Sequence, residues 1–274
     1  MTAYLRAVRS EFAKFFSTRS WWILLLVMVG YLAAVAGVMG FVVGFASEQL
    51  STGGQPAELS GAAGVVYSLA TSMGYVFPLL IGALAVTGEF RHNTLTPTFL
   101  AIPRRGAVLA GKATALAIVG AGYGIAALLG TMGAGAALLA IGGVDTELGS
   151  TDTWAMVGRI ILAMALWAIV GVGVGSIVPN QVASIVIVLA LTQFIEPILR
   201  MGSMLSEVTA SLSRFLPGSA SDSLVGSSIY TLMSGSAHPN VTPLEWWQGG
   251  AVLAAIALVL LVIGSWTSWR RDLD

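Results

Sequence analysis

The sequence predicts an all-α integral membrane protein with six transmembrane helices. Hydrophobic residues make up 56% and charged residues only 9% of its 274 positions, whereas soluble domains carry about 25% charged residues. Six apolar stretches are long enough, at roughly 20 residues each, to cross a bilayer as a helix. Arg and Lys are concentrated in alternate connections between these stretches, which is the pattern of loops that remain in the cytoplasm.

The six stretches together predict a single transmembrane domain over residues 1–274. They cover residues 21–45, 62–87, 108–141, 154–178, 182–199 and 246–269. The third stretch is longer than one crossing requires, so we expect it to tilt or to extend beyond the bilayer. Pro78 predicts a bend in the second stretch, and Pro197 predicts another at the end of the fifth.

Basic residues set the expected orientation. They occur before the first stretch, after the second and at the C-terminus: Arg6, Arg9, Lys14, Arg19, Arg91, Arg104, Arg105, Lys112, Arg270 and Arg271. The loops around residues 47–61 and 142–153 contain acidic residues but neither Arg nor Lys. We therefore expect a multi-pass protein of the bacterial cytoplasmic (inner) membrane with both termini in the cytoplasm. The formal net charge of zero gives no general attraction for nucleic acid, which is not an expected partner.

Residues 1–20 predict an amphipathic helix that lies in the membrane interface. One helical face carries Tyr4, Leu5, Val8, Phe12, Phe15 and Phe16, and the other carries Arg6, Arg9, Ser10 and Lys14. A basic amphipathic segment beside a span is typical of an interfacial helix. The alternative is a simple positively charged anchor.

Two short segments resemble ATPase motifs without meeting their requirements. Gly106, Gly111 and Lys112 have P-loop spacing, but Ala113 replaces the hydroxyl residue that would bind magnesium, and a membrane span follows. We interpret Lys112 as a residue at the cytoplasmic edge of that span. The segment LSTGGQ, residues 50–55, resembles an ABC signature but falls in an expected outer loop. No catalytic residue or metal site is predicted, because the chain has no cysteine and only two histidines.

The loop between the second and third spans, residues 88–107, is the most informative segment. It reads GEFRHNTLTPTFLAIPRRG over its first nineteen positions. Thr94 to Leu100 can form a short helix across the membrane surface, with Thr96 as its cap and Pro97 at its first position. The alternative is an ordinary solvated loop of positive charge.

The chain resembles the permease subunits of the type-2 ABC-transporter exporter family, particularly actinobacterial ones. The resemblance is carried by four features: the basic helix before six spans, the loop pattern E-F-R-H-N-T-L-T-P-T-F-L-A-x-P-R-R, the minimal loop after the fourth span, and the long segment between the fifth and sixth spans. It implies a type V exporter-like fold. It also implies that residues 88–107 form a coupling helix that docks on a separate ATPase.

The resemblance implies specific docking residues and partners. The docking residues would be Glu89, Phe90, Arg91, His92, Thr94, Leu95 and Thr96, flanked by Arg104 and Arg105. The partner ABC ATP-binding subunit would hold ATP and Mg, so no cofactor is expected on this chain. A second permease copy or a paralogue would complete the translocation path within the lipid bilayer.

The segment 200–245 is expected on the outer side of the membrane. Its apolar residues Met201, Met204, Leu205, Val208, Leu212 and Phe215 recur at helical spacing. The resemblance implies short or re-entrant helices above the path, whereas the alternative is an interfacial loop. Glu196 and Arg200, four residues apart across Pro197, are expected to pair and either stabilise a bend or line an outer gate.

Small residues at four-residue spacing predict close contacts between helices. They are Gly40 and Gly44, Gly120 and Gly124, and Gly171 and Gly175. The nearly charge-free spans favour a hydrophobic or amphipathic substrate for an ATP-driven exporter, and no carboxylate is expected deep in the membrane. The alternatives are a secondary carrier or channel, and a membrane enzyme, neither with an ATPase partner.

Overall fold

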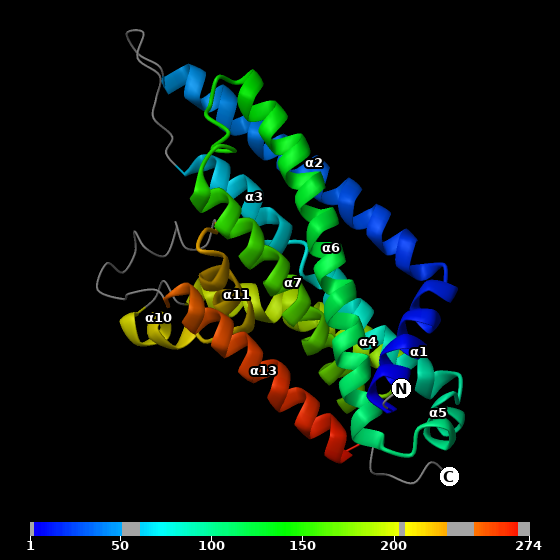
Figure 1. Ribbon diagram of the computed structural model, residues 1–274. Helices are drawn as coiled ribbons and strands as arrows, with labels where there is room; N and C mark the ends of the chain where they lie inside the picture. Colours follow the sequence, from blue (N-terminus) through cyan, green and yellow to red (C-terminus); the bar gives the residue numbers. More distant parts are fainter. Residues whose placement is uncertain (1–2, 51–60, 203–205, 229–243, 268–274) are drawn as a thin grey trace.

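The computed structural model describes residues 3–50, 61–202, 206–228 and 244–267, and every regular element in these ranges is a helix. Six helical segments within them are long and apolar enough to cross a membrane, as predicted. They cover residues 20–45, 62–91, 105–141, 151–177, 181–202 and 246–267. The chain is therefore an all-α protein with the composition of a multi-pass membrane protein (Figure 1).

The first half of the chain contains two long helices and one broken one. The elements are α1 (Ala3–Ser17), α2 (Ser20–Leu50), α3 (Ala62–Ser72), α4 (Val76–Arg91), α5 (Leu95–Ala101) and α6 (Arg105–Ile141). At 1.5 Å per residue, α6 is about 55 Å long, so it exceeds the hydrocarbon thickness of about 30 Å. This length agrees with the prediction for the third span. In Figure 1, α1 and the last turn of α13 lie at the end of the bundle that carries α5, here called the α5 end.

The second span is interrupted at residues 73–75, and not at Pro78 as the sequence predicted. A Cβ atom on Gly74 would overlap the carbonyl oxygen of Ala70, so only glycine fits at this break. Pro78 lies in the first turn of α4, where its missing N–H group costs no helical hydrogen bond. The bend therefore precedes the proline, because the proline begins the next helix.

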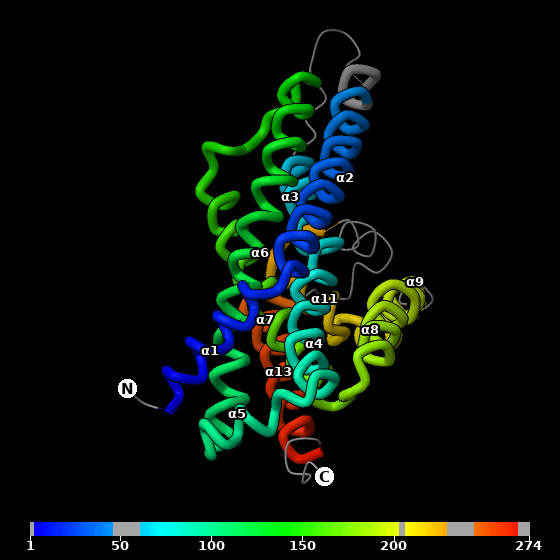
Figure 2. The backbone as a smooth tube through the Cα atoms, turned by 90° about the vertical axis from the view of Figure 1, so that its right-hand side faces the viewer, coloured from blue at the N-terminus to red at the C-terminus, as the bar shows by residue number. Residues whose placement is uncertain are grey.

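The second half of the chain continues with α7 (Thr151–Ile177), α8 (Gln181–Ala190), η1 (Leu191–Ile195), α9 (Glu196–Gly202), α10 (Glu207–Ser213), α11 (Pro217–Val225) and α13 (Trp246–Thr267). The fifth span does not end at Pro197. It passes through the π-helical turn η1, whose wider backbone accommodates the proline that follows. In Figure 2, α8 and α9 lie at the edge of the bundle.

The predicted glycines lie where two helices approach each other closely. Cβ atoms on Gly40 and Gly44 would meet Gly135 and Gly142 of α6. Those on Gly120 and Gly124 would meet α7, and those on Gly171 and Gly175 would meet α4. All six contacts lie within this one chain. They bring α2, α6, α7 and α4 together around a core that contains the buried rings of Tyr67 and Trp167.

Two predictions fall partly outside the described residues. The segment LSTGGQ lies there except for Leu50, and so do Met204 and Leu205 of the expected amphipathic helix. The helices in the described part of segment 200–245 are the end of α9 and the short helices α10 and α11. α11 packs against the beginning of α13, where Gly249 approaches the backbone of Ala220.

Candidate functional site

The predicted short helix of the loop is α5, which lies at one end of the bundle between the second and third spans (Figure 1). It begins at Leu95, so Thr96 lies inside the helix and is not its cap. Buried Leu95 anchors one side of α5 to the bundle. The guanidinium group of Arg105 lies 5.2 Å from the centre of the Phe99 ring, so a cation–π contact also fastens α5 to the start of α6.

The predicted docking residues separate into exposed and buried positions. Arg91, His92, Thr94, Thr96 and Arg104 are exposed, and Phe90 and Arg105 are half-buried. Glu89 and Leu95 are buried, with 5% and 3% of their surfaces exposed. Glu89 and Leu95 were predicted to lie on the exposed docking surface, but both side chains lie in the core.

The exposed face of α5 also carries Leu100, which sequence reasoning did not select. Its surface is 80% exposed although its side chain is large and apolar. The exposure of Leu100 could have been predicted from its position on the helix face opposite Leu95, because a short helix cannot bury both of its faces against one bundle.

Four charged residues form a cluster directly behind α5: Glu11 and Lys14 of α1, Glu89 of α4 and Lys112 of α6. The ammonium nitrogen of Lys14 lies 2.8 Å from Glu11 Oε1 and 2.5 Å from Glu89 Oε1. That of Lys112 contacts Glu11 Oε2 and lies 3.2 Å from Glu89 Oε1. The cluster joins three helices at the point where the second span turns into the loop of α5.

Lys112, predicted at the cytoplasmic edge of the span, lies near the start of α6 and is fully buried. A lysine two turns into an apolar helix requires a buried carboxylate partner. Glu11 is the only acidic residue on α1, so its pairing with Lys112 could have been predicted from the sequence. The charges of the cluster sum to zero. Partial burial lowers the pKa of Lys14, but the carboxylates of Glu11 and Glu89 outweigh it, and the net shift is upward.

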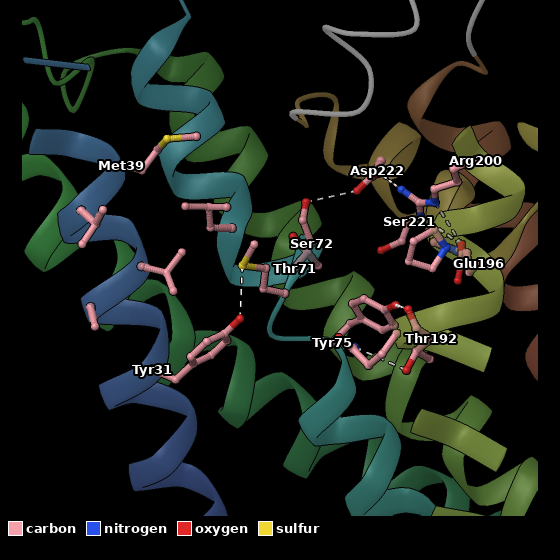
Figure 3. Close-up of a pocket in the computed structure, with 18 of the residues that line it drawn as sticks. Tyr31, Met39, Thr71, Ser72, Tyr75, Thr192, Glu196, Arg200, Ser221 and Asp222 are labelled. Carbon is pink, nitrogen blue, oxygen red and sulfur yellow. Dashed lines mark hydrogen bonds and ion pairs between the residues drawn. The ribbon is translucent and has the colours of Figure 1, made fainter. Parts of the chain in front are cut away.

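A second charged cluster lies near the junction of α9 and α11, and it includes the predicted pair Glu196 and Arg200 (Figure 3). Arg200 Nη2 lies 3.0 Å from Glu196 Oε1, and Arg200 Nη1 lies 2.6 Å from Asp222 Oδ2. The backbone N–H of Gly218 also donates to Glu196 Oε1, at 2.5 Å. Asp222 was missed because the segment between it and Arg200 gives no pattern that places its carboxylate opposite Arg200.

The two irregular points of the second and fifth spans are joined beside this cluster. The hydroxyl of Tyr75, at the break between α3 and α4, donates to the carbonyl of Thr192 in η1 at 3.1 Å. The Tyr75 ring stacks at a tilt on Trp167, with 4.4 Å between ring centroids. Trp167 Nε1 in turn donates to Ser221 Oγ of α11 at 3.0 Å. These contacts connect both spans to α11.

A cavity of about 480 Å³ lies between α2, the break in the second span and the second charged cluster. Apolar side chains of α2 line one wall, among them Val35, Val38 and Met39. The opposite wall carries Glu196, Arg200 and Asp222, and Figure 3 shows the two walls facing each other. The hydroxyl of Thr71, which also lines the cavity, is buried and has no hydrogen-bond partner in the structure.

The walls of this cavity differ in chemistry, and this determines what it can bind. A molecule with one apolar and one polar end matches the walls, because its apolar end would leave water while its polar end meets paired charges and a free hydroxyl. Glu196 and Asp222 share the single cation of Arg200, so the polar wall offers hydrogen bonds and carries one formal negative charge. Pro197 also lines the cavity, beside the π-helical turn.

Comparison with known proteins leaves the chain without an assigned family. No family model matches the sequence, and no curated protein matches it significantly.

Proposed function

We propose that this chain is the transmembrane permease subunit of an ATP-driven exporter with a type-2 ABC permease fold of the type V exporter kind. In this proposal a separate ABC ATP-binding subunit binds ATP and Mg and docks on α5. The α5 end faces the cytoplasm of a bacterium, as the basic residues of the sequence indicate. Two copies, or this chain and a paralogue, form the path for a hydrophobic or amphipathic substrate.

The observation that carries the proposal is the attachment of α5 to the spans. α5 presents Thr96 and Leu100 outward, and the exposed Arg104 follows it just before α6. Directly behind it, the cluster of Glu11, Lys14, Glu89 and Lys112 joins three helices. A force applied to α5 would therefore move the ends of α1, α4 and α6 together. Rigid elements that move as one body are the usual means of converting a partner's movement into a change of span tilt.

The cavity supports the export role. It lies beside the break at Gly74 and the π-helical turn, which are the positions where the second and fifth spans can change direction most easily. The hydrogen bond from Tyr75 to Thr192 joins these positions, so a tilt of the second span would be transmitted to the fifth. The mixed lining suits an amphipathic substrate.

A secondary carrier is the alternative that one observation favours. Such a carrier needs ionisable groups inside the protein, and Glu11, Glu89, Glu196 and Asp222 are all at most 7% exposed. Each of them is paired with a Lys or Arg in the structure. Paired charges serve structure more readily than proton exchange, so we favour the exporter.

Purification of the tagged chain from its native membranes tests the proposal. The expected result is co-purification, in equal amounts, of a subunit with a complete P-loop and ABC signature, together with ATP hydrolysis by the complex. Transport by the chain alone that is driven by a proton gradient and insensitive to ATP would contradict it and support the carrier.

A further inference from the structure

A second cavity, of about 430 Å³, lies where α1 turns into α2 and the second span reaches its end. We call it the elbow cavity; its walls include Lys14, Trp21, Ile81, Gly88, Glu89 and Arg91. The proposed export function assigns no ligand to this space, although Lys14 and Glu89 also belong to the charged cluster behind α5 and Arg91 is a predicted docking residue. It lies on the opposite side of the break at Gly74 from the 480 Å³ cavity, because its α4 residues follow the break by several turns.

Glu89 lines this cavity and has one carboxylate oxygen without a partner among the described residues. Its Oε1 accepts a hydrogen bond from Lys14 and forms an ion pair with Lys112. Its Oε2 is buried and accepts no hydrogen bond from any described residue. A buried carboxylate oxygen without a hydrogen-bond donor costs free energy, because its lost hydration is not replaced. The arrangement therefore has room for one further donor at this oxygen.

A cationic group stands at the same cavity. Arg91 is exposed, and its Nη1 is held by the side-chain oxygen of Gln181 at 3.1 Å. The amide of Gln181 carries no charge, so this contact does not neutralise the guanidinium of Arg91. The elbow cavity thus combines a carboxylate that lacks a donor with a guanidinium group that can bind an anion.

The remaining walls match a lipid. Ile81, Leu84 and Leu116 supply an apolar side, and Phe15 and Trp21 supply aromatic rings whose centres lie 6.3 Å apart. Trp beside a span is typical of the depth at which lipid headgroups meet the acyl chains. The cavity therefore opens where phospholipids are the most abundant molecules.

We propose that the elbow cavity binds a phospholipid whose headgroup is a primary amine, of the phosphatidylethanolamine class. Its ammonium donates to Glu89 Oε2, its phosphate pairs with Arg91, and its acyl chains lie along the side formed by Ile81 and Leu84. A zwitterionic headgroup leaves the neutral charge of the cluster unchanged. A choline headgroup has no N–H to donate, and a glycerol headgroup is anionic and carries no ammonium. This inference requires only that the chain lies in a membrane.

Native mass spectrometry of the purified full chain tests the proposal. The probes are dioleoyl phosphatidylethanolamine, phosphatidylcholine and phosphatidylglycerol, added separately to delipidated protein. We expect one tightly retained phosphatidylethanolamine, with affinity about tenfold above that of phosphatidylcholine, as a charge-assisted hydrogen bond provides. Equal retention of all three lipids, or preference for phosphatidylglycerol, would overturn the proposal.

Two variants and a control locate the site. Glu89→Gln should remove the preference for the amine headgroup. Gly88→Leu should block the cavity, because a Cβ atom there meets no atom within 4 Å and the added side chain has free space. Gly106→Leu is the matched control, since Gly106 is equally unobstructed but lies outside the cavity, and it should retain the lipid. Retention of the lipid by a folded Gly88→Leu protein would overturn the assignment even if Glu89→Gln failed to fold.

Discussion

The ammonium group of Lys112 contacts the carboxylate of Glu11, although 101 positions of sequence separate the two residues. The contact attaches α1 to α6, and both side chains are buried. α1 is therefore more than a surface helix on the membrane, because it contributes a charge to the interior of the bundle. Its buried residues, Ala7 and Glu11, form a face distinct from the aromatic and basic faces read from the sequence.

Replacement of Lys112 by Met should destabilise the protein strongly. The change removes the most buried cation of the cluster and leaves Glu11 and Glu89 with Lys14 alone. Loss of one partner of a buried ion pair costs about 3–5 kcal/mol. Thermal unfolding in detergent, followed by tryptophan fluorescence, measures the effect. Exposed Arg104 provides the control, because Arg104→Met should change the stability by no more than about 0.5 kcal/mol. Equal unfolding temperatures for the two variants would contradict the cluster's structural role.

Gly218→Ala should disrupt the second charged cluster. An added Cβ atom would overlap the guanidinium group of Arg200 and the carboxylate of Glu196, so one of them must move. We expect a loss of about 1–3 kcal/mol of unfolding free energy, as for overpacked core positions. Gly202→Ala at the end of α9 is the matched control, since its Cβ would meet nothing within 4 Å. Equal stability of both variants would show that Arg200 does not occupy this position.

Two buried threonines allow a direct test of the hydroxyl in the 480 Å³ cavity. Thr71 Oγ1 has no hydrogen-bond partner, whereas Thr131 Oγ1 donates to the carbonyl of Ala127 at 3.1 Å. Thr131→Val should lower the unfolding free energy by about 1 kcal/mol, and Thr71→Val should leave it unchanged or raise it. A similar loss in both variants would mean that Thr71 is already hydrogen-bonded, and its hydroxyl would not be free for a substrate.

The spans and the loop helix could be predicted from the sequence, because each depends on local composition. Twenty apolar residues form a span whatever they pack against, and Pro97 favours a helix start close to Leu95. The pairing of Glu196 with Arg200 could also be predicted, since the two residues lie four positions apart on one helix.

The long-range contacts could not be predicted in the same way. The burial of Glu89 depends on Lys14 and Lys112, which lie on two other helices. The break at Gly74 depends on the close approach of its backbone to the carbonyl of Ala70, whereas the sequence predicted the bend at Pro78. Asp222 meets Arg200 only because α11 folds back beside α9 and α13. Local patterns predict elements, whereas these sites depend on how the elements pack.

Site-directed crosslinking from α5 tests most directly whether a separate ATPase docks on this helix. The chain contains no cysteine, so Leu100→Cys and Ile141→Cys each introduce a single thiol. Both positions are 80% exposed, but Leu100 lies on α5 and Ile141 lies at the far end of α6. With a thiol-reactive photocrosslinker in native membranes, the account predicts a crosslink to an ATP-binding subunit from position 100, and none from position 141. Equal crosslinking from the two positions, or no ATP-binding subunit from either, would contradict it.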